Sequence, residues 1–239
     1  MLKVDNISAG YGRLQILTDV TFEALPGELT IVVGPNGSGK STLLKSVAGL
    51  TNLYKGTITM DGTTLSGHSP HVIARHGLAY LPQTESVFTK LTVTENFKMA
   101  AYMISKADYG SRLKDALEVF PQLNAYLQSK VMNLSGGERQ MVAMTMALLR
   151  KPQVIMFDEP TANLSPKYAT EVLKTIQKLG KERGLTIVLV EQNAKRALEI
   201  GDKAYLLVGG KNAFKGTARE LLSHQELARM YLGMKVASA

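Results

Sequence analysis

The residues best suited to chemistry lie between positions 34 and 42, where glycines are spaced among polar side chains. The segment reads Gly34, Pro35, Asn36, Gly37, Ser38, Gly39, Lys40, Ser41 and Thr42. The spacing G-x-x-x-x-G-K-[ST] is that of a loop that holds the β- and γ-phosphates of a nucleotide together with Mg²⁺. Glycines let such a loop turn its N–H groups inward. We expect Lys40 to give charge to the phosphates and Ser41 to give a hydroxyl to Mg²⁺.

The flanking sequence supplies the elements that this loop needs. Residues 29–33 form an apolar, β-branched run that predicts a buried strand, and residues 41–48 predict a helix closed by Gly49. Thr42 extends the first turn of that helix. The phosphates would then sit at the positive end of the helix dipole.

A second pair of candidate residues ends the apolar run 154–157, namely Asp158 and Glu159. We expect this run to be a strand beside the strand 29–33, with Asp158 holding Mg²⁺. Glu159 is placed to orient and deprotonate an attacking water. The alternative, two carboxylates solvated in a loop, is disfavoured because a phosphate loop is present.

A third segment, Leu134-Ser135-Gly136-Gly137-Glu138, opens an apolar helix. Ser135 and Glu138 have the spacing of a helix capping box, which is a purely structural interpretation. Two glycines in a first turn cost about 1 kcal/mol each relative to alanine, so their presence favours the close approach of a ligand. Serine, glycine N–H groups and the helix dipole together predict a second anion site.

Composition limits the class of protein. The chain has 239 residues, of which 45 % are hydrophobic, and it has no cysteine. The lack of cysteine excludes disulfides and thiolate metal sites. The length and hydrophobic content are enough for the core of one large domain. We see no leader-like start and no apolar run of 18 residues. A net charge of +8 is compatible with nucleic acid, an anionic membrane surface or simple solubility. Because the charges are spread along the chain, we favour a solvated surface with some bias toward acidic membranes, and we expect no nucleic-acid partner.

The order of predicted elements indicates an α/β fold. Strand-like runs at 3–7, 20–24, 29–33 and 56–60 precede a segment near 93–149 with helical patterns, and strands return at 154–157, 186–190 and 204–208. Helices are predicted at 167–181 and 194–200, and Asp61-Gly62 predicts a hairpin turn. The alternation favours a mostly parallel sheet with helices on both faces.

These motifs, in this order, resemble those of the ATP-binding-cassette (ABC) ATPases over almost the whole chain. The resemblance implies a P-loop NTPase fold: one domain over 1–239, a mostly parallel core sheet, an N-terminal antiparallel β subdomain and a helical subdomain at about 88–150. It implies that ATP and Mg²⁺ are bound, with Gln83 touching the metal. Tyr11 matches an aromatic residue that stacks on adenine, although a core tyrosine is the alternative.

The resemblance also implies partners. Two such domains dimerise head to tail, so that Ser135, Gly136 and Gly137 of one chain clamp the γ-phosphate held by the other. The helical subdomain receives a helix from a membrane permease, which places the chain peripherally on the cytoplasmic face of the membrane. Six of the methionines lie in or beside this subdomain, and they suit either an adaptable docking groove or a core: Met99, Met103, Met132, Met141, Met144 and Met146.

Two positions depart from the common family pattern. Gln192 stands where histidine is usual, and an amide can donate a hydrogen bond to the γ-phosphate but cannot carry charge. Ser165 stands where aspartate is common, which weakens the usual contact across the dimer. We expect hydrolysis to be retained, with Glu159, Lys40 and Gln192 as the catalytic residues.

The departures narrow the resemblance. Val190-Glu191-Gln192-Asn193, Leu164-Ser165-Pro166-Lys167 and the ending Tyr231-Leu232-Gly233 are similar to ATPase subunits of branched-chain amino-acid importers. Gln83 fits that subgroup less well, since many members have glutamate there. Tyr80-Leu81-Pro82-Gln83 also resembles lipopolysaccharide-export ATPases. A soluble ABC ATPase without a transporter is a third alternative, disfavoured because only one cassette and no cysteine-bearing insertion are present.

Overall fold

A six-stranded sheet forms the centre of the chain in the computed structural model, which describes residues 1–84 and 86–231. The resemblance noted at Leu232 and Gly233 lies outside those residues. Within them the strand order is β10-β9-β3-β8-β7-β6, and all neighbours are parallel except β10 and β9. The bounds are β3 (Leu29–Val33), β6 (Leu78–Leu81), β7 (Val154–Asp158), β8 (Thr186–Val190), β9 (Lys203–Val208) and β10 (Lys211–Thr217).

The predicted neighbour of the phosphate-loop strand was wrong. We expected the strand that carries Asp158 to lie beside β3, but β8 lies between β3 and β7. Sequence order does not determine strand order in a parallel sheet, because each crossover can pass over a neighbour. Asp158 still reaches the phosphate loop because β7 and β3 both end at the same edge of the sheet.

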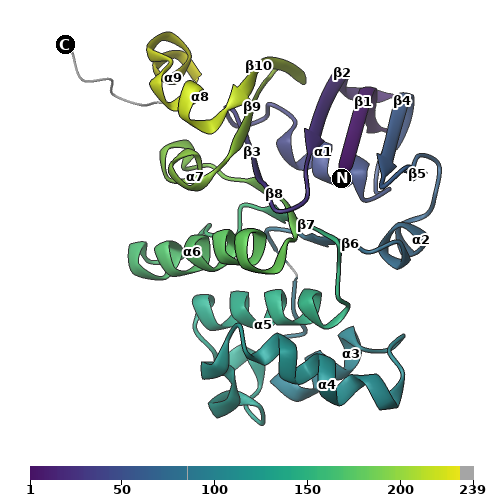
Figure 1. The fold of residues 1–239 in the computed structure, drawn as a ribbon, viewed down its shortest axis with the longest axis vertical. Coiled ribbons are helices and arrows are strands. Elements are labelled where there is room, and N and C mark those ends of the chain that lie inside the picture. Colours follow the sequence, from purple (N-terminus) through teal and green to yellow (C-terminus); the bar gives the residue numbers. More distant parts are fainter. Residues whose placement is uncertain (85, 232–239) are drawn as a thin grey trace.

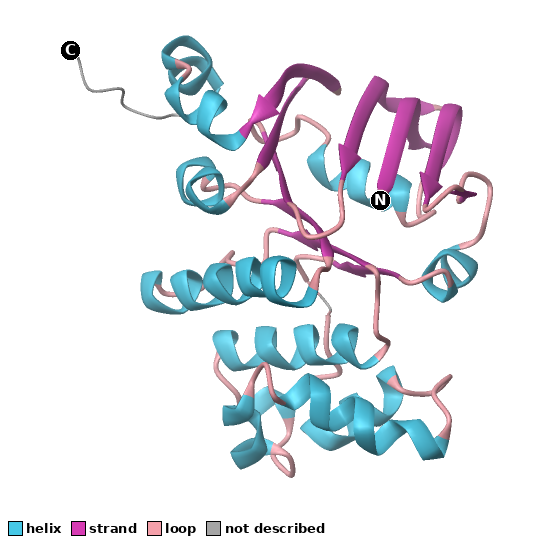
Figure 2. Cartoon of the chain, viewed as in Figure 1, coloured by secondary structure: helices cyan, strands magenta, loops and turns pink. Residues whose placement is uncertain are grey.

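Each face of this sheet packs against a different layer (Figures 1 and 2). Side chains alternate between faces along a strand, so Ile31 and Ile155 join one core while Val32 and Met156 join the other. Helices α6 (Pro166–Arg183) and α7 (Ala194–Ile200) cover the first face. Helix α1 (Lys40–Val47) and the N-terminal strands cover the second. The β–α alternation predicted from the sequence is therefore confirmed.

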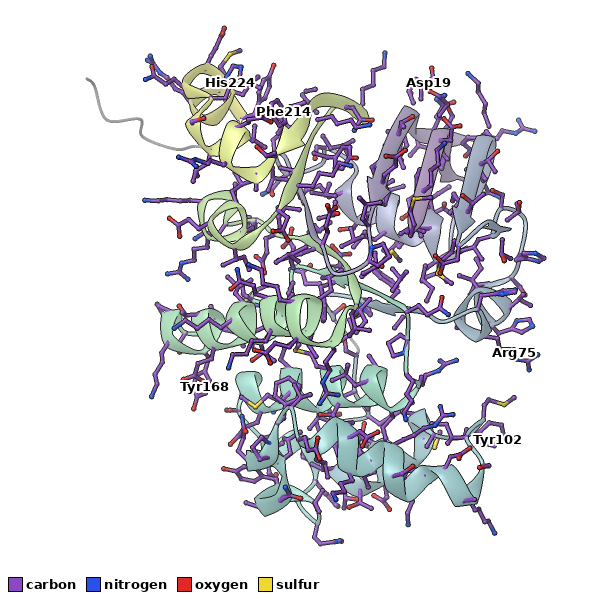
Figure 3. The ribbon with its side chains drawn as sticks, viewed as in Figure 1. Asp19, Arg75, Tyr102, Tyr168, Phe214 and His224 are labelled. Carbon is purple, nitrogen blue, oxygen red and sulfur yellow. The ribbon has the colours of Figure 1, made fainter. Side chains whose placement is uncertain are left out.

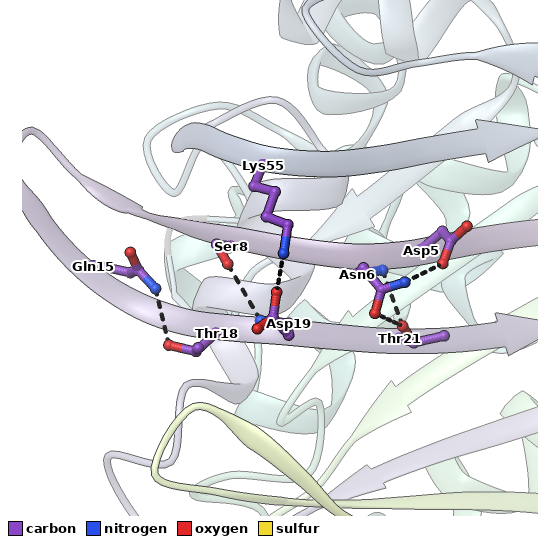
Figure 4. A network of polar contacts seen from close by, with 8 residues as sticks. All are labelled: Asp5, Asn6, Ser8, Gln15, Thr18, Asp19, Thr21 and Lys55. Carbon is purple, nitrogen blue, oxygen red and sulfur yellow. Dashed lines mark hydrogen bonds and ion pairs between the residues drawn. The ribbon is translucent and has the colours of Figure 1, made fainter.

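A second sheet, antiparallel and in the order β2-β1-β4-β5, is formed by β1 (Leu2–Tyr11), β2 (Leu14–Ala24), β4 (Asn52–Met60) and β5 (Thr63–Thr64). The register of β1 on β2 shifts between Val4 and Ile7. Asn6 and Asp19 adopt left-handed backbone there, with φ of 47° and 51°. Polar contacts hold the irregularity, including Lys55 Nζ donating to Asp19 Oδ1 at 2.9 Å (Figure 4). Such bulges strengthen the twist of a sheet.

Helical segments fill most of the chain between β6 and β7. They are α3 (Val93–Ala100), α4 (Lys106–Leu117), two 3₁₀ turns (Pro121–Tyr126 and Val131–Asn133) and α5 (Gly136–Leu149). Figure 1 shows α3, α4 and α5 grouped at one end of the molecule, beyond α6. The remaining helices are α2 (Pro70–Arg75), α8 (Ala218–Ser223) and α9 (Gln225–Tyr231). Across the described part of the chain, every helix is too short or too polar to cross a membrane.

Candidate functional site

The predicted phosphate loop connects β3 to α1, and its lysine is folded back into it. Lys40 Nζ donates to the carbonyl oxygens of Gly34 at 2.9 Å and Pro35 at 3.1 Å. Gly39 precedes the helix with a φ of 97°, which disfavours any side chain there. Burial lowers the pKa of Lys40, and the carboxylates of Glu159 and Asp158 oppose that shift. The ammonium therefore stays close to two acidic groups and to the centre of the loop.

The loop fits a phosphate group. Ser38 Oγ is buried and finds no hydrogen-bond partner in the described part of the chain, so it is free to donate to an anion. A Cβ at Gly34 would collide with the carbonyl oxygen of Leu207, so only glycine fits at this position of the loop. The loop runs directly into α1, whose N-terminal N–H groups attract negative charge. This donor set matches the chemistry of a nucleotide triphosphate tail.

Asp158, at the end of β7, links the loop to the neighbouring strands. Its Oδ1 accepts from Ser41 Oγ at 2.9 Å and its Oδ2 accepts from Tyr80 Oη at 3.0 Å. A hydroxyl and a carboxylate oxygen in contact are ligands that suit Mg²⁺. In the described residues no group of three or more acidic, histidine or cysteine side chains could hold a metal alone. Mg²⁺ is usually held by one or two protein oxygens together with phosphate oxygens and water, and the Ser41–Asp158 pair suits that arrangement.

Glu159 follows in an unusual backbone conformation, with a φ of 50°. Its N–H donates to the carbonyl of Val190 at 2.9 Å, which ties it to the end of β8. Gln83 Nε2 donates to Glu159 Oε2 at 3.2 Å. The structure thus brings together five predicted site residues at one edge of the sheet: Lys40, Ser41, Gln83, Asp158 and Glu159.

A cavity of about 780 Å³ opens beside Glu159 and is also lined by Glu191 and Gln192. Glu191 is only 3 % exposed, and its Oε1 accepts from the N–H of Thr161 at 3.1 Å. Burial, opposed by hydrogen bonds from Thr161, raises the pKa of Glu191 to about 6. Gln192 is exposed at the cavity, and Asn193 caps α7. The predicted switch residue therefore shares a cavity with Glu159.

The Ser135 segment lies apart from the phosphate loop of the same chain. Its capping box forms, since Ser135 N donates to Glu138 Oε2 at 2.7 Å and Glu138 N donates to Ser135 Oγ at 3.3 Å. A Cβ on Gly137 would lie 2.9 Å from the Tyr168 ring, and one on Gly136 would lie 3.3 Å from Leu164. Packing against α6 is thus a structural reason for the glycine at 137. In Figure 1, α5 lies in a different part of the molecule from α1.

Tyr11 ends β1 with its side chain 43 % exposed, next to the Gly12 backbone that Tyr54 Oη contacts at 2.9 Å. It is therefore not a core tyrosine. An exposed aromatic ring on this turn is available to stack on a planar ligand.

Tyr80 and Glu191 both contact the predicted site, although no role for either residue was predicted from the sequence. Tyr80 precedes Gln83 by three residues, and Glu191 precedes Gln192 directly. The useful signal for Glu191 is a carboxylate placed directly after the apolar run 187–190, since a carboxylate that is buried there must be hydrogen-bonded. For Tyr80 the signal is an aromatic side chain with a polar tip near the end of a short apolar strand.

Known proteins resemble this chain closely. The profile of the ABC transporter family matches residues 17–162. A probable branched-chain amino acid transport ATP-binding protein LivF of Archaeoglobus fulgidus is 50 % identical over 98 % of this chain and 99 % of its own length. The high-affinity branched-chain amino acid transport ATP-binding protein BraG of Pseudomonas aeruginosa is 38 % identical over 98 % and 100 %. The lipopolysaccharide export protein LptB of Haemophilus influenzae is 31 % identical over 98 % and 97 %.

Solved structures agree in fold. The ATP-binding subunit of an ABC transporter superimposes with a TM-score of 0.79 at 32 % identity and covers 100 % of this chain and 95 % of that chain. A dimeric ATP-binding cassette with ADP and phosphate bound has a TM-score of 0.79 at 25 % identity, covering 92 % and 99 %. The predicted α/β fold with a mostly parallel sheet is confirmed by these matches and by the strand order. From the family profile and the near-complete coverage of these relatives, we conclude that the chain belongs to the ABC transporter family, as one of its ATP-binding cassettes.

Proposed function

We propose that this chain hydrolyses ATP to energise a membrane transporter, most specifically an importer of branched-chain or other hydrophobic amino acids. The proposal of ATP hydrolysis rests on two hydrogen bonds made by consecutive residues, Asp158 and Glu159, at the end of β7. Ser41 reaches Asp158 and Gln83 reaches Glu159, so a metal-binding pair and a base lie on consecutive residues. The base and the metal ligands therefore face the same phosphate loop.

The residues divide the reaction among them. The N–H groups of the loop and Lys40 hold the β- and γ-phosphates, while Tyr11 stacks on the adenine. Mg²⁺, when bound to Ser41, Asp158 and Gln83, would neutralise charge on the phosphates. Glu159 accepts the proton of the attacking water. Gln192, which lines the same cavity as Glu159, donates a hydrogen bond to the γ-phosphate.

Replacement of the base tests this assignment. Glu159→Gln keeps the shape of the side chain but removes the proton acceptor, so phosphate release should fall at least about 100-fold. ATP binding should persist, and ATP should then hold a dimer that size-exclusion chromatography detects. The exposed Glu182→Gln on α6 is the matched control and should hydrolyse ATP normally. Unchanged hydrolysis by Glu159→Gln contradicts the assignment.

The substrate assignment rests on similarity. The two relatives named for branched-chain amino acid transport are 50 % and 38 % identical, whereas the lipopolysaccharide export relative is 31 % identical. Deleting the gene should abolish high-affinity uptake of radiolabelled leucine and leave uptake of an unrelated solute unchanged. Unchanged leucine uptake would remove the importer assignment and leave export as the alternative.

The partners follow from the same proposal. A cavity of about 390 Å³ lies where α2, β6, α3 and α5 meet, and most of its wall is apolar. Met99 and Met103 stand exposed at the α3 end, whereas Met141 and Met144 are buried in the core. Figure 3 shows Arg75 on α2 and Tyr102 after α3 on the same side of the molecule. A permease helix docking here would place the chain on the cytoplasmic face of the membrane, paired with a second ATPase subunit.

A further inference from the structure

Tyr80 belongs to two sites at once. It lies on β6, the edge strand of the six-stranded sheet among the described residues, and it lines the 390 Å³ cavity together with Ala74 of α2 and Ala147 of α5. Its hydroxyl also donates to Asp158 Oδ2 at 3.0 Å. One side chain therefore forms part of the cavity wall and bonds to the carboxylate of the nucleotide site.

The register of the strands explains this double contact. Tyr80 pairs with Met156 in the parallel ladder of β6 and β7. Side chains two residues apart point to the same face of a sheet, so Asp158 points to the face of Met156 and Tyr80. The tyrosine is long enough to reach diagonally along that face to the end of the neighbouring strand.

The contact leaves the carboxylate little freedom. Asp158 is 4 % exposed, and its two oxygens accept from different hydroxyls, Ser41 on one side and Tyr80 on the other. A phenol keeps its proton at neutral pH, so Tyr80 is the donor in this contact and the carboxylate is the acceptor. Rotation of the carboxylate would break one of these bonds.

We propose that Tyr80 is a positioning residue that orients Asp158 for the metal and makes that orientation depend on what fills the cavity beside β6. The proposal rests on the proposed function, because it assigns Asp158 to a Mg²⁺–nucleotide complex. It adds a route from the docking cavity to the metal ligand that passes through β6 and does not involve Gln83. An apolar side chain that enters the cavity displaces the phenol ring, and the hydrogen bond from the hydroxyl then changes the orientation of the Asp158 carboxylate.

The first test separates metal positioning from general stability. Tyr80→Phe removes one hydroxyl and keeps the ring, so the affinity for ADP in Mg²⁺ should fall about fivefold, while the affinity in EDTA stays unchanged. Isothermal titration calorimetry measures both. Tyr205→Phe is the matched control, because the hydrogen bonds of this hydroxyl to the described residues are with the Glu23 backbone, whose N–H donates to it at 3.0 Å. Neither affinity should change in this variant. An equal loss in Mg²⁺ and in EDTA, or no loss at all, overturns the proposal.

The second test supplies the cavity with an occupant. Ala74→Trp places a large apolar side chain in the cavity. It should weaken ADP binding in the presence of Mg²⁺ and leave binding in EDTA unchanged. In the double variant with Tyr80→Phe, that effect should disappear, because the link to Asp158 is already cut. Additive effects of the two substitutions, or no effect of Ala74→Trp in a variant whose thermal unfolding is cooperative, overturn the coupling.

These outcomes are distinct from failure of the proposed function. If the unmodified chain binds no ADP in either buffer, the proposed function is wrong. If it binds ADP with a clear dependence on Mg²⁺ and Tyr80→Phe behaves as the unmodified chain does, only the role of Tyr80 is wrong.

Discussion

Gln192 differs from histidine because its amide does not titrate near neutral pH, yet it still offers an N–H donor. It lines the same cavity as Glu159. Removing the donor with Gln192→Ala should lower kcat about 100-fold, the usual effect of losing a hydrogen bond to transition-state charge. Gln192→His should retain most of the activity above pH 7. Phosphate-release assays measure both, with the exposed Gln225→Ala as control. Full activity of Gln192→Ala would contradict a role for this residue.

Glu191 makes stability depend on pH. Its folded-state pKa is raised from 4.5 to about 6, mainly by burial, so folding favours the protonated form. The stabilising contribution is complete below pH 4.5 and is lost as the pH rises through 6. Glu191→Gln removes the charge, so its stability relative to the unmodified chain should be higher at pH 7.5 than at pH 4 by about 2 kcal/mol. Urea unfolding at the two pH values measures this. A constant difference would argue against a buried, titrating Glu191.

Among the elements, the strands and the phosphate loop were the most predictable. The apolar run at 29–33 and the helix at 194–200 have the predicted bounds, because a buried strand and a capped helix have strong local signals. The order β3-β8-β7 was not predictable from local pattern, since it depends on how crossovers pack. The Tyr80–Asp158 contact likewise joins residues 78 positions apart and depends on the pairing of β6 with β7.

The docking site proposed for the permease can be tested with a substitution just after α3. Met103 lies three residues after Ala100, the last residue of α3, which lines the cavity. Met103 is 64 % exposed, so a charge there should not affect folding. Met103→Glu should weaken co-purification with the permease subunits at least about tenfold, because an apolar docking surface would bury an unpaired carboxylate. ATP hydrolysis by the isolated chain should not change. Met230→Glu on α9, with a similar exposure of 62 %, is the matched control. Equal co-purification by both variants would place the permease elsewhere.

On the scale of the whole molecule, the phosphate loop and the Ser135 segment of one chain do not meet. Two-fold symmetry in a head-to-tail dimer would let each chain complete the site of the other. A Lys40→Ala chain and a Ser135→Arg chain should each be inactive alone. Random mixing should restore about a quarter of the activity, because half of the dimers are mixed and each mixed dimer has one intact site. Phosphate release across mixing ratios measures this.

The absence of any recovery on mixing, with both chains folded, would mean that this chain does not pair with itself. The second ATPase subunit would then be a different protein, and the same experiment with that subunit would show which chain supplies the Ser135 segment. If either variant hydrolysed ATP on its own, without mixing, the shared site would be contradicted.

The left-handed backbone of Glu159, with its φ of 50°, has a consequence for how this protein adapts to heat. Glycine would relax that backbone, since residues with side chains cost of order 1 kcal/mol or more in this region. Yet glycine offers no carboxylate for the water. Selection for thermal tolerance and selection for turnover therefore act in opposite directions at one codon. Substitutions that raise the thermal stability of this ATPase without loss of turnover are therefore expected at positions away from the end of β7.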